Sequence, residues 1–412
     1  LMTQTGFIAS SMIALVLLNT NSSFALLRAG ASSRIITPQS PAYLAGLRNN
    51  RLSQGVHDDL FARCLILDDG QTQVGFVSTD LIGLTSSAIA EIRNRAKLIG
   101  SSAENVIITA THQHSGPDTI GLWGKSESHS GVDPSYIDFL YNQIVSVIKD
   151  AKENLEPAEI SFGASQIEES DRVSRNAREP DLIDRDLGVI KVDRNNGETI
   201  ATIVNFTAHP EVMWSDSLLL TAEYPGVVYR ECDEKIGGIT LFINGALGGM
   251  ITTSNQFNTF EEVERIGGIV AQKAIEAAEL AEKQVNPKIQ HSFELLEIPL
   301  ENQNFQTLMD LGILPKEMPI NGNIHTEVHL IEIGNAQIAT FPGEVLPKLG
   351  FRVKNNMTSD YNFILGLAND ELGYILAAED YEKELYKYEK SMSIGSQAGS
   401  ITTNALLGLL RK

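Results

Sequence analysis

Three β-like apolar runs each lead directly into a side chain that could bind a metal ion. The runs and the residues that follow them are 105–110 before His112 and His114, 202–208 before His209, and 336–341 before Glu344. Ligands in α/β sheets gather at strand ends, because the loops there diverge while the sheet holds their bases still. Two imidazoles and one carboxylate form a suitable set for a catalytic zinc ion that keeps one position open for water.

Each of these side chains also has a simpler interpretation. A lone His-Pro pair such as His209-Pro210 is typical of a turn. Glu344 could cap a helix over residues 346–354, because carboxylates are favoured at helix N-termini. The pair His112 and His114 is more specific, since residues two apart in extended chain face the same side and can enter one cavity. The repetition at three strand ends favours one shared metal site, although spacing alone does not show that the loops meet.

The remaining histidines are predicted to have structural or surface roles. They are His57, His129, His291, His325 and His329. Among them His57 is an exception. A histidine beside two acids and before a strand could hydrogen-bond to a metal ligand and orient it.

Alternating strands and helices are needed to position the candidate ligands. The strand-like runs are 61–69, 72–80, 105–110, 187–193, 202–208, 238–244, 289–300, 328–334, 336–341 and 362–368. The amphipathic helices are predicted over 86–98, from Pro134 to about Asn154, and from Thr259 to about Lys283. No linker or repeat divides this pattern. It therefore predicts one large layered α/β domain, with mixed β-sheets flanked by helices and a metal site at strand ends.

Composition excludes several classes of protein. The chain has 412 residues, of which 42% are apolar and 20% charged, as in folded soluble proteins, and its length alone would suggest two or three domains. The formal charge of −20 repels phosphate backbones, so nucleic acid is not an expected partner. Two cysteines, Cys64 and Cys232, exclude a disulfide framework and a cysteine-rich zinc module. The sequence also lacks a dinucleotide fingerprint, a Walker loop and a G-x-S-x-G elbow.

The N-terminal segment has features of an export signal. Residues 7–18 form an apolar run that is shorter than the about 20 residues needed to cross a bilayer. Residues 23–25 (Ser-Phe-Ala) fit a small-x-small cleavage site, but no Lys or Arg precedes Arg28. We therefore expect a signal peptide over 1–25 and a secreted or extracytoplasmic protein. The alternatives are a buried first helix or an uncleaved segment that anchors the protein to a membrane.

Several motifs resemble the neutral/alkaline, non-lysosomal ceramidases. The matching segments are 55–70, 108–118, 205–211, 222–226, 341–345 and 373–389. They occur in the same order from about residue 29 to about residue 402, and the T-H-x-H-S-G-P motif is the most selective of them. The resemblance implies a zinc-dependent amidase that splits the N-acyl bond of ceramide into a sphingoid base and a fatty acid.

The resemblance also implies roles for individual residues. The implied zinc ligands are His112, His209, Glu344 and Tyr374. The implied catalytic and substrate-contacting residues are His114, Tyr388 or Tyr386, and Arg175 or Arg178. Tyr388 is slightly preferred over Tyr386, and Tyr381 is a further alternative. For both arginines, a surface charge or a salt bridge is an equally open interpretation.

These residues fit the chemistry of amide hydrolysis. Zinc lowers the pKa of bound water towards about 7, which makes a strong nucleophile available near neutral pH. His114 or a tyrosine could stabilise the developing oxyanion, and a titratable neighbour must protonate the leaving amine.

Two features depart from the family pattern. Gly249 stands where the family has an essential serine, although Thr252, Thr253 or Ser254 could substitute for it. The glycines of this loop could also simply permit close backbone approach. The chain ends at Lys412 without the family's additional immunoglobulin-like domain, so we expect a catalytic-domain-only member over 26–412.

The predicted function is therefore zinc-dependent hydrolysis of ceramide or a related N-acyl lipid or amide. The expected partner is this small-molecule substrate, with at most transient contact with a membrane surface, and the oligomeric state stays open. Because Gly249 replaces the serine, the alternative is a non-catalytic or differently specific protein that binds a metal or lipid. A phosphoester hydrolase is less favoured, since no group of Arg or Lys accompanies the candidate ligands.

Overall fold

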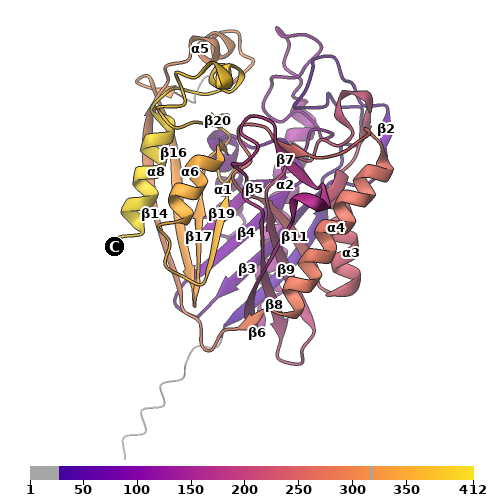
Figure 1. The fold of residues 1–412 in the computed structure, drawn as a ribbon, viewed down its shortest axis with the longest axis vertical. Helices are drawn as coiled ribbons and strands as arrows, with labels where there is room; N and C mark the ends of the chain where they lie inside the picture. Colours follow the sequence, from indigo (N-terminus) through magenta and orange to yellow (C-terminus); the bar gives the residue numbers. More distant parts are fainter. Residues whose placement is uncertain (1–26, 316–318) are drawn as a thin grey trace, which may run out of the picture.

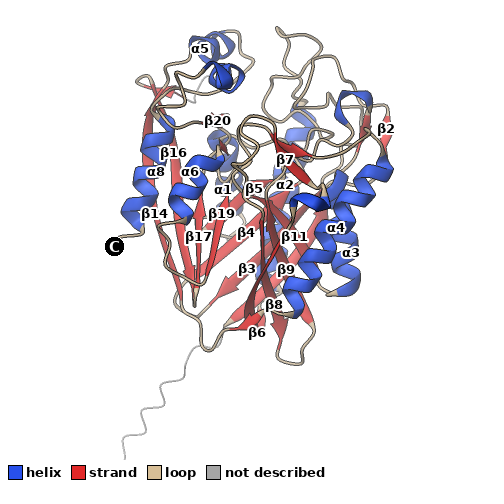
Figure 2. Ribbon diagram, in the orientation of Figure 1, coloured by secondary structure: helices blue, strands red, loops and turns tan. Residues whose placement is uncertain are grey.

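Two β-sheets packed face to face, with helices on their outer faces, form the scaffold (Figures 1 and 2). The structure is a computed structural model that describes residues 27–315 and 319–412. The predicted signal peptide, residues 1–25, lies outside the described residues. The fold is the layered α/β arrangement with mixed sheets that the alternating pattern predicts.

The larger sheet has nine strands in the order β11-β9-β8-β6-β1-β3-β4-β5, with β13 paired to β6. Its strands are β1 (Arg28–Ile35), β3 (Phe61–Asp68), β4 (Gln73–Thr79), β5 (Val106–Ala110), β6 (Glu156–Gln166), β8 (Asp186–Arg194), β9 (Thr199–Phe206), β11 (Ile239–Asn244) and β13 (Glu282–Lys283). The sheet curls so strongly that its edge strand β11 contacts β3 and β4, where Arg63 donates to the carbonyl of Thr240. The curl brings the ends of β5 and β9 together, although these strands lie far apart in the strand order.

The second sheet has the order β14-β16-β17-β19, with β15 paired to β16. Its strands are β14 (Ile289–Pro299), β15 (Pro319–Ile320), β16 (Asn323–Ile333), β17 (Ala336–Thr340) and β19 (Tyr361–Leu365). The apolar core between the two sheets includes Phe76, Phe162, Ile203, Ile331, Ile338 and Phe363. Burial of this shared face fixes β17, and therefore Glu344, against the larger sheet.

Helices cover the outer faces of both sheets. The described helices are α1 (Ser86–Leu98), α2 (Pro134–Glu153), α3 (Glu223–Lys235), α4 (Phe260–Glu279), α5 (Gln303–Asp310), α6 (Pro347–Lys354), α7 (Lys387–Ser391) and α8 (Ala398–Leu409). Helices α1 to α4 pack on the side of the larger sheet, and α6 and α8 pack on the second sheet (Figure 1). Helix α2 shows why such segments form helices. Asp133 caps its N-terminus by accepting from Ser135 N, and its apolar residues recur at helical spacing on the buried face.

Three short two-stranded pairs and three 3-10 turns complete the described elements. The pairs are β2 (Gly55–Val56) with β10 (Leu219–Leu220), β7 (Ser174–Asn176) with β12 (Ile251–Thr253), and β18 (Glu344–Val345) with β20 (Tyr374–Ile375). The turns are Glu169–Asp171, Trp214–Asp216 and Glu384–Tyr386. The pair β18 and β20 bears directly on the candidate site, because it holds Glu344 beside Tyr374.

Most of the predicted elements are confirmed, with one clear correction. The helices predicted over 86–98 and from Pro134 are α1 and α2. The helix predicted to run to about Lys283 ends at Glu279 instead, because Glu282 and Lys283 pair with β6 as the short strand β13. The pattern did not predict β1, β6, α3 or α8.

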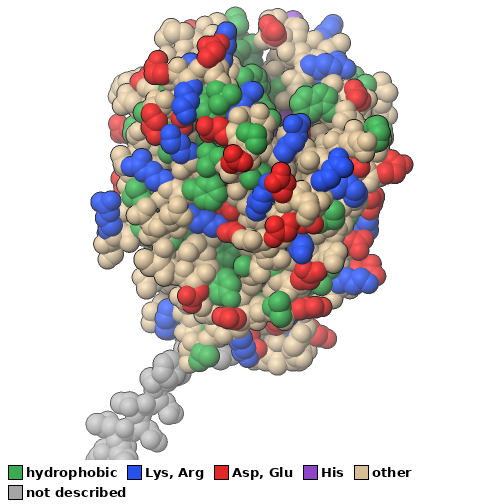
Figure 3. All heavy atoms as spheres, in the orientation of Figure 1, with side chains coloured by type: hydrophobic (Ala, Val, Ile, Leu, Met, Phe, Trp, Pro, Cys, Tyr) green, Lys and Arg blue, Asp and Glu red, His purple; other side chains and the backbone are tan. Residues whose placement is uncertain are grey.

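The drawn face carries mixed charge, and the two cysteines are free. Lys and Arg are interspersed with Asp and Glu on the face drawn in Figure 3, which therefore presents no continuous basic surface for a phosphate backbone. Cys64 and Cys232 are both buried and unpaired. Among the helices of the described ranges, none combines the length and the apolar character needed to span a membrane.

Candidate metal centre

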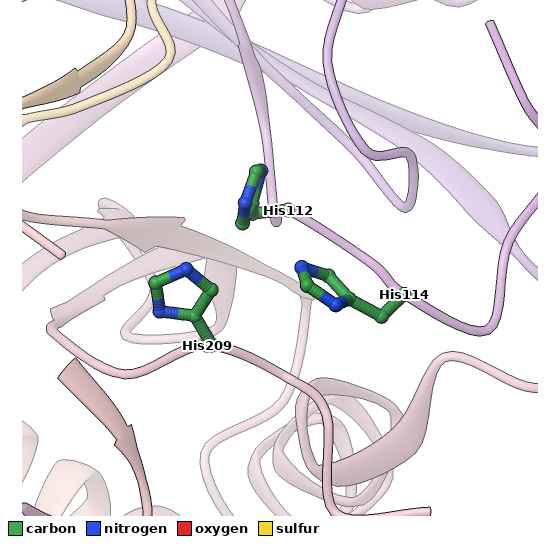
Figure 4. Close-up of side chains that lie close together, drawn as sticks. All are labelled: His112, His114 and His209. Carbon is green, nitrogen blue, oxygen red and sulfur yellow. The ribbon is translucent and has the colours of Figure 1, made fainter. Parts of the chain in front are cut away.

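Three buried histidine rings converge at the strand ends (Figure 4). The ring centroid of His112 lies 5.0 Å from that of His114 and 4.9 Å from that of His209, and the latter two are 5.6 Å apart. One nitrogen from each ring lies within 4.8 Å of the others. These three histidines could hold a metal ion, so the two loops after β5 and β9 do meet in space.

The backbone at His112 differs from the extended chain that the spacing suggested. His112 has a φ of +65°, in the left-handed region that non-glycine residues seldom adopt. The expectation that His112 and His114 share a side because the chain is extended is therefore wrong. They enter one cavity because this left-handed turn redirects the chain, and backbone strain of this kind is typical of functional sites.

Hydrogen bonds to the backbone fix the orientation of two of the rings. His112 Nδ1 lies 2.7 Å from the carbonyl oxygen of Ile82, and His209 Nδ1 lies 2.7 Å from that of Ile251. Because a carbonyl can only accept, each Nδ1 carries a proton, so the Nε2 atoms face the centre and present lone pairs there when the rings are neutral. This is the arrangement that metal-binding histidines show.

Glu344 faces the same two nitrogens. Its Oε1 lies 3.5 Å from His112 Nε2, and its Oε2 lies 3.1 Å from His209 Nε2. Burial opposes ionisation of Glu344, but His112 and His209 outweigh it and hold the pKa of this carboxyl well below its usual range. In the same pair, the Glu344 carboxylate raises the pKa of His209 to about 9 against the opposing effect of burial. A carboxylate and two imidazole lone pairs are a donor set that suits a cation such as Zn²⁺.

His114 is the third ring, and its environment differs from the other two. Neither of its ring nitrogens has a hydrogen-bond partner among the described residues, although the ring is buried. Burial, reinforced by His112 and His209, lowers the pKa of His114 well below its usual value. Glu211 Oε2 lies 3.3 Å from His114 Nδ1. A buried imidazole without a partner is uncommon in proteins and indicates that a ligand meets it here.

Asn244, at the end of β11, ties the two histidine loops together. Its Nδ2 donates to the carbonyl of Thr111, 2.6 Å away, and its Oδ1 accepts from the backbone N–H of Ala208 at 3.2 Å. Thr111 and Ala208 directly precede His112 and His209. One fully buried side chain therefore sets the spacing of the two loops.

Tyr374 lies beside Glu344 because β18 and β20 form a parallel pair with these two residues in register. Both side chains are buried. Burial, followed by the charge of Glu344, raises the pKa of the Tyr374 hydroxyl well above its usual value. The phenol is therefore protonated at neutral pH unless a metal ion binds its oxygen.

A cavity of about 520 Å³, including its open mouth, lies next to this cluster. Its polar wall is formed by His112, His114, Glu344, Glu371, Tyr374 and Tyr388. Its apolar lining residues, the apolar wall, are Ile82, Ile120, Leu122, Trp123, Phe305 and Met392, and Gly46 and Gly373 complete the lining. The cavity therefore combines reactive side chains with an extended apolar surface, as ligand sites commonly do.

The predicted tyrosines differ in their positions. Tyr388 lines the cavity, with its ring 5.9 Å from that of Tyr374, and burial raises the pKa of Tyr388 to about 12. Tyr386 does not line the cavity, and its hydroxyl donates to Glu179 at 2.6 Å. Tyr381 packs beside the small cluster around Tyr386 and does not line the cavity either.

Neither of the predicted arginines lines the cavity. Arg178 Nε donates to the fully buried Glu389 at 2.7 Å, which is the salt bridge that the sequence left open. Because Glu389 follows Tyr388, this bridge fastens α7 to the loop after β7. Arg175 is exposed on the strand pair β7 and β12, opposite Thr252.

The glycine-rich loop after β11 permits close backbone approach. A Cβ on Gly248 would lie 2.2 Å from the carbonyl oxygen of Glu344, so only glycine fits there. Gly249 has a φ of +73°, and a Cβ there would point at Leu346 and Tyr386 instead of lining the cavity. The alternatives at 252–254 do not line the cavity either.

The other histidines lie outside the cavity lining. His57, which could have supported a ligand, is half-exposed and stacks on Phe260 with a ring-centroid distance of 3.6 Å. Its neighbour Asp58 accepts hydrogen bonds from Thr221 and Ala222, so it fastens the segment that leads into α3.

A partly buried charged cluster holds the loop that carries Tyr374. Glu327 accepts from Arg93 at 2.6 Å and lies 3.0 Å from His329 Nε2. Burial raises the pKa of Glu327, but the hydrogen bonds from His329 and Arg93 outweigh it and lower the pKa to about 2. Asn369 donates to Glu327 and accepts from Ile108 of β5, so the cluster couples this loop to the histidine-bearing strand.

Three buried glutamates around the site were not predicted from the sequence: Glu211, Glu223 and Glu371. Glu223 accepts from Ser115 and from the backbone of Val212, which links the two histidine loops a second time. Burial, followed by the charge of Glu344, raises the pKa of Glu371 well above its usual value. For Glu211 and Glu223 the available signal was an acidic residue inside a motif-like segment, whereas Glu371 lies outside the matching segments.

Comparison with known proteins first defines the class of fold. A crystal structure of neutral ceramidase from Pseudomonas aeruginosa superposes with a TM-score of 0.77, over 94% of this chain and 75% of that chain, at 18% identity. A ceramidase structure complexed with C2 superposes with a TM-score of 0.79 over the same shares, also at 18% identity. The described chain therefore has the neutral ceramidase fold.

Sequence comparisons find similarity to the same family. Residues 42–241 match the family described as neutral/alkaline non-lysosomal ceramidase, N-terminal. The neutral ceramidase of Pseudomonas aeruginosa is 24% identical over 270 residues, which is 59% of this chain and 40% of that protein. The neutral ceramidase of Mycobacterium tuberculosis is 25% identical over 210 residues, which is 46% of this chain and 33% of that protein. The predicted relationship to the neutral/alkaline non-lysosomal ceramidases is confirmed, and the matched region spans less than half the length of these curated relatives.

Proposed function

We propose that this protein is a zinc-dependent amidohydrolase that cleaves the N-acyl bond of ceramide or of a related N-acyl lipid or amide. The observation that carries the proposal is the convergence of three buried histidines and Glu344 at a cavity that also has an apolar wall. The relationship to neutral ceramidases supports the choice of an amide as the bond cleaved.

In this proposal, His112, His209 and Glu344 hold the zinc, with Tyr374 beside them as the fourth ligand. The Nδ1 bonds to backbone carbonyls support a metal in this position, because they turn the Nε2 atoms of His112 and His209 towards Glu344. When bound, zinc would supply Lewis acidity and a water of lowered pKa as nucleophile.

The neighbouring side chains then have distinct tasks. His114 exchanges a proton with the reacting groups, because its ring nitrogens make no hydrogen bond to the described chain. Glu211 Oε2, 3.3 Å from His114 Nδ1, is close enough to orient the ring. Tyr388 stays protonated at neutral pH, since its pKa is about 12, and it can donate a hydrogen bond to the developing oxyanion.

The apolar wall supports an acyl chain as part of the substrate. Its aromatic members, Trp123 and Phe305, and its aliphatic members would cover a hydrocarbon chain and exclude water from it. Gly249 does not line this cavity, so the difference at the family's serine position does not remove a group from it.

The direct test is hydrolysis of a short-chain ceramide by the purified chain, followed as fatty acid release by mass spectrometry. We expect release that stops on chelation and returns with added Zn²⁺. His114→Ala should lower kcat by about 10²- to 10⁴-fold and retain zinc, because the lost group is an acid–base catalyst and not a ligand. The matched control is His129→Ala, which removes an exposed histidine outside the cavity.

Two outcomes would refute this proposal. Saturable ceramide binding by the zinc-loaded protein without product would favour the non-catalytic alternative. Full activity in the chelated protein would exclude a metal-dependent mechanism.

A further inference from the structure

Glu371 places a buried carboxylate in the cavity wall with one oxygen unused. Its Oε1 accepts from the backbone N–H of Gly373 at 3.0 Å, whereas its Oε2 is buried and has no hydrogen-bond partner among the described residues. The side chain is 8% exposed and shares the cavity with His112 and Glu344. No Lys or Arg lines the cavity within the part of the chain that the structure describes.

The surrounding chain holds this carboxylate in place. A Cβ on Gly83 would lie 2.7 Å from the Glu371 Cγ, so the absence of a side chain there makes room for the glutamate. The Glu371 backbone N–H donates to Asp370 Oδ1 at 2.9 Å, and the same oxygen accepts from Ser86 at the start of α1. Glu371 is therefore a preorganised group and not a mobile surface acid.

The environment of Glu371 Oε2 differs from that of the two Glu344 oxygens, which face the histidines. Both oxygens of Glu344 lie near imidazole nitrogens, so that side chain belongs to the candidate metal set. Within the described ranges, Glu371 makes no hydrogen bond or ion pair with a histidine or a cationic side chain, so the zinc proposal does not use it. Buried acceptors are nearly always paired in native proteins, and an unpaired one on a residue that lines a cavity is suited to a donor on a ligand.

We propose that Glu371 determines substrate specificity: its Oε2 accepts a hydrogen bond from a hydroxyl or ammonium group on the nitrogen side of the scissile amide. This inference rests on the proposed amidase function. Because the apolar wall takes the acyl chain, the donor belongs to the amine part of the substrate. An approaching cationic group or a bound metal also favours the ionised carboxylate, because opposite charge stabilises that form.

Glu371→Gln is the informative substitution. Glutamine can keep its carbonyl oxygen on the Gly373 N–H, which places its NH₂ group where Oε2 was. The shape is preserved while an acceptor becomes a donor. The control is Glu332→Gln on β16, whose carboxylate is bonded to Gln337 and does not line the cavity.

Three matched N-dodecanoyl amides serve as probes, differing only in the group on nitrogen: 2-hydroxyethyl, 2-aminoethyl or propyl. Binding is followed by the fluorescence of Trp123 in the cavity wall, in a Trp214→Phe background that removes the second tryptophan. Because this readout does not need turnover, it is measured on the zinc-loaded protein separately from hydrolysis.

We expect the protein with Glu371 intact to bind at least one donor-bearing amide 10-fold or more tightly than the propyl amide. The stronger of the two identifies hydroxyl or ammonium as the preferred donor. Glu371→Gln should reduce the preference for the 2-aminoethyl amide by 10-fold or more, and that for the 2-hydroxyethyl amide by less, since a hydroxyl can accept from the new NH₂. Glu332→Gln should leave both preferences unchanged.

Equal binding of all three amides, or the same preference in Glu371→Gln, would overturn the role of Glu371. Failure to bind any of the probes would overturn it as well. Hydrolysis separates the two proposals. Selective binding without product would contradict the amidase and support the specificity residue, whereas equal cleavage of all three amides would support the amidase and overturn the specificity residue.

Discussion

Asn244→Ala should weaken zinc binding without touching any ligand. The change removes two fully buried hydrogen bonds, to the carbonyl of Thr111 at 2.6 Å and from the N–H of Ala208 at 3.2 Å. Each partner would then lack a bond in the interior, at a cost of about 1–3 kcal/mol apiece, so the free energy of unfolding should fall by about 2–6 kcal/mol. The loops that carry His112 and His209 would lose the side chain that sets the distance between them.

The assay has two parts. Urea unfolding of the metal-free protein gives the loss of stability without the contribution that bound zinc makes to the folded state. Competition with a chelator then gives the zinc affinity of the folded variant. We expect the affinity to fall by about 10- to 100-fold, as is typical when a residue that supports metal ligands is removed.

Asn205→Ala is the matched control. Asn205 lies on β9 and donates to the carbonyls of Ile243 and Ile364, so it also makes two side-chain bonds to the backbone at the same end of the sheet. Neither partner adjoins a histidine loop. If Asn244→Ala loses stability but binds zinc as tightly as Asn205→Ala, Asn244 is a general structural residue and the reasoning is refuted.

Three further predictions follow from single contacts. Gly248→Ala should destabilise the protein by about 1–3 kcal/mol or more and weaken zinc binding, because its Cβ would lie 2.2 Å from the carbonyl oxygen of Glu344. Glu327→Gln should remove a pH-dependent contribution of about 3 kcal/mol. With a folded pKa of about 2, against 4.5 ordinarily, this contribution is present above pH 4.5 and is lost as pH falls towards 2. Tyr388→Phe should lower kcat by about 10²- to 10³-fold with little change in KM, whereas Tyr386→Phe should leave kcat unchanged.

Each of these has its own comparison. Gly268→Ala, on an open face of α4, should stabilise by about 1 kcal/mol, and equal effects at the two glycines would contradict the steric argument. Unfolding measured between pH 2.5 and 7 should show wild type and Glu327→Gln converging at low pH, and a constant difference would exclude the ionisation mechanism. Tyr386→Phe should lower stability by about 1 kcal/mol, because it loses its hydrogen bond to Glu179. A loss of kcat in Tyr386→Phe together with an unchanged kcat in Tyr388→Phe would contradict the catalytic role given to Tyr388.

The sequence predicted where the reactive side chains lie because strand ends leave a simple pattern. An apolar run followed by His112, His209 or Glu344 is visible in the chain, and all three lie together in the structure. The family resemblance added Tyr374, which no periodicity indicates. Its pairing with Glu344 depends on the short strands β18 and β20, which are too brief to have a recognisable pattern.

Features that depend on long-range contacts could not be predicted in this way. The left-handed backbone at His112 leaves no compositional mark, because histidine is not a residue that the conformation demands. Asn244 ends a run that the sequence predicts as a strand, yet its bonds to both histidine loops follow only from the curl of the sheet. Glu371 carries no periodic signal, and its importance is visible only from the oxygen left without a partner.

The central claim is that His112, His209 and Glu344 form one zinc centre, and zinc stoichiometry tests it most directly. Inductively coupled plasma mass spectrometry on the purified, dialysed chain should give one zinc per molecule for wild type. His209→Ala should give close to no zinc, because it removes a proposed ligand. The Nδ1 of this ring contacts the Ile251 carbonyl and its Nε2 faces Glu344 at the centre. Absence of zinc from the wild type, or equal zinc in His209→Ala, would contradict the account.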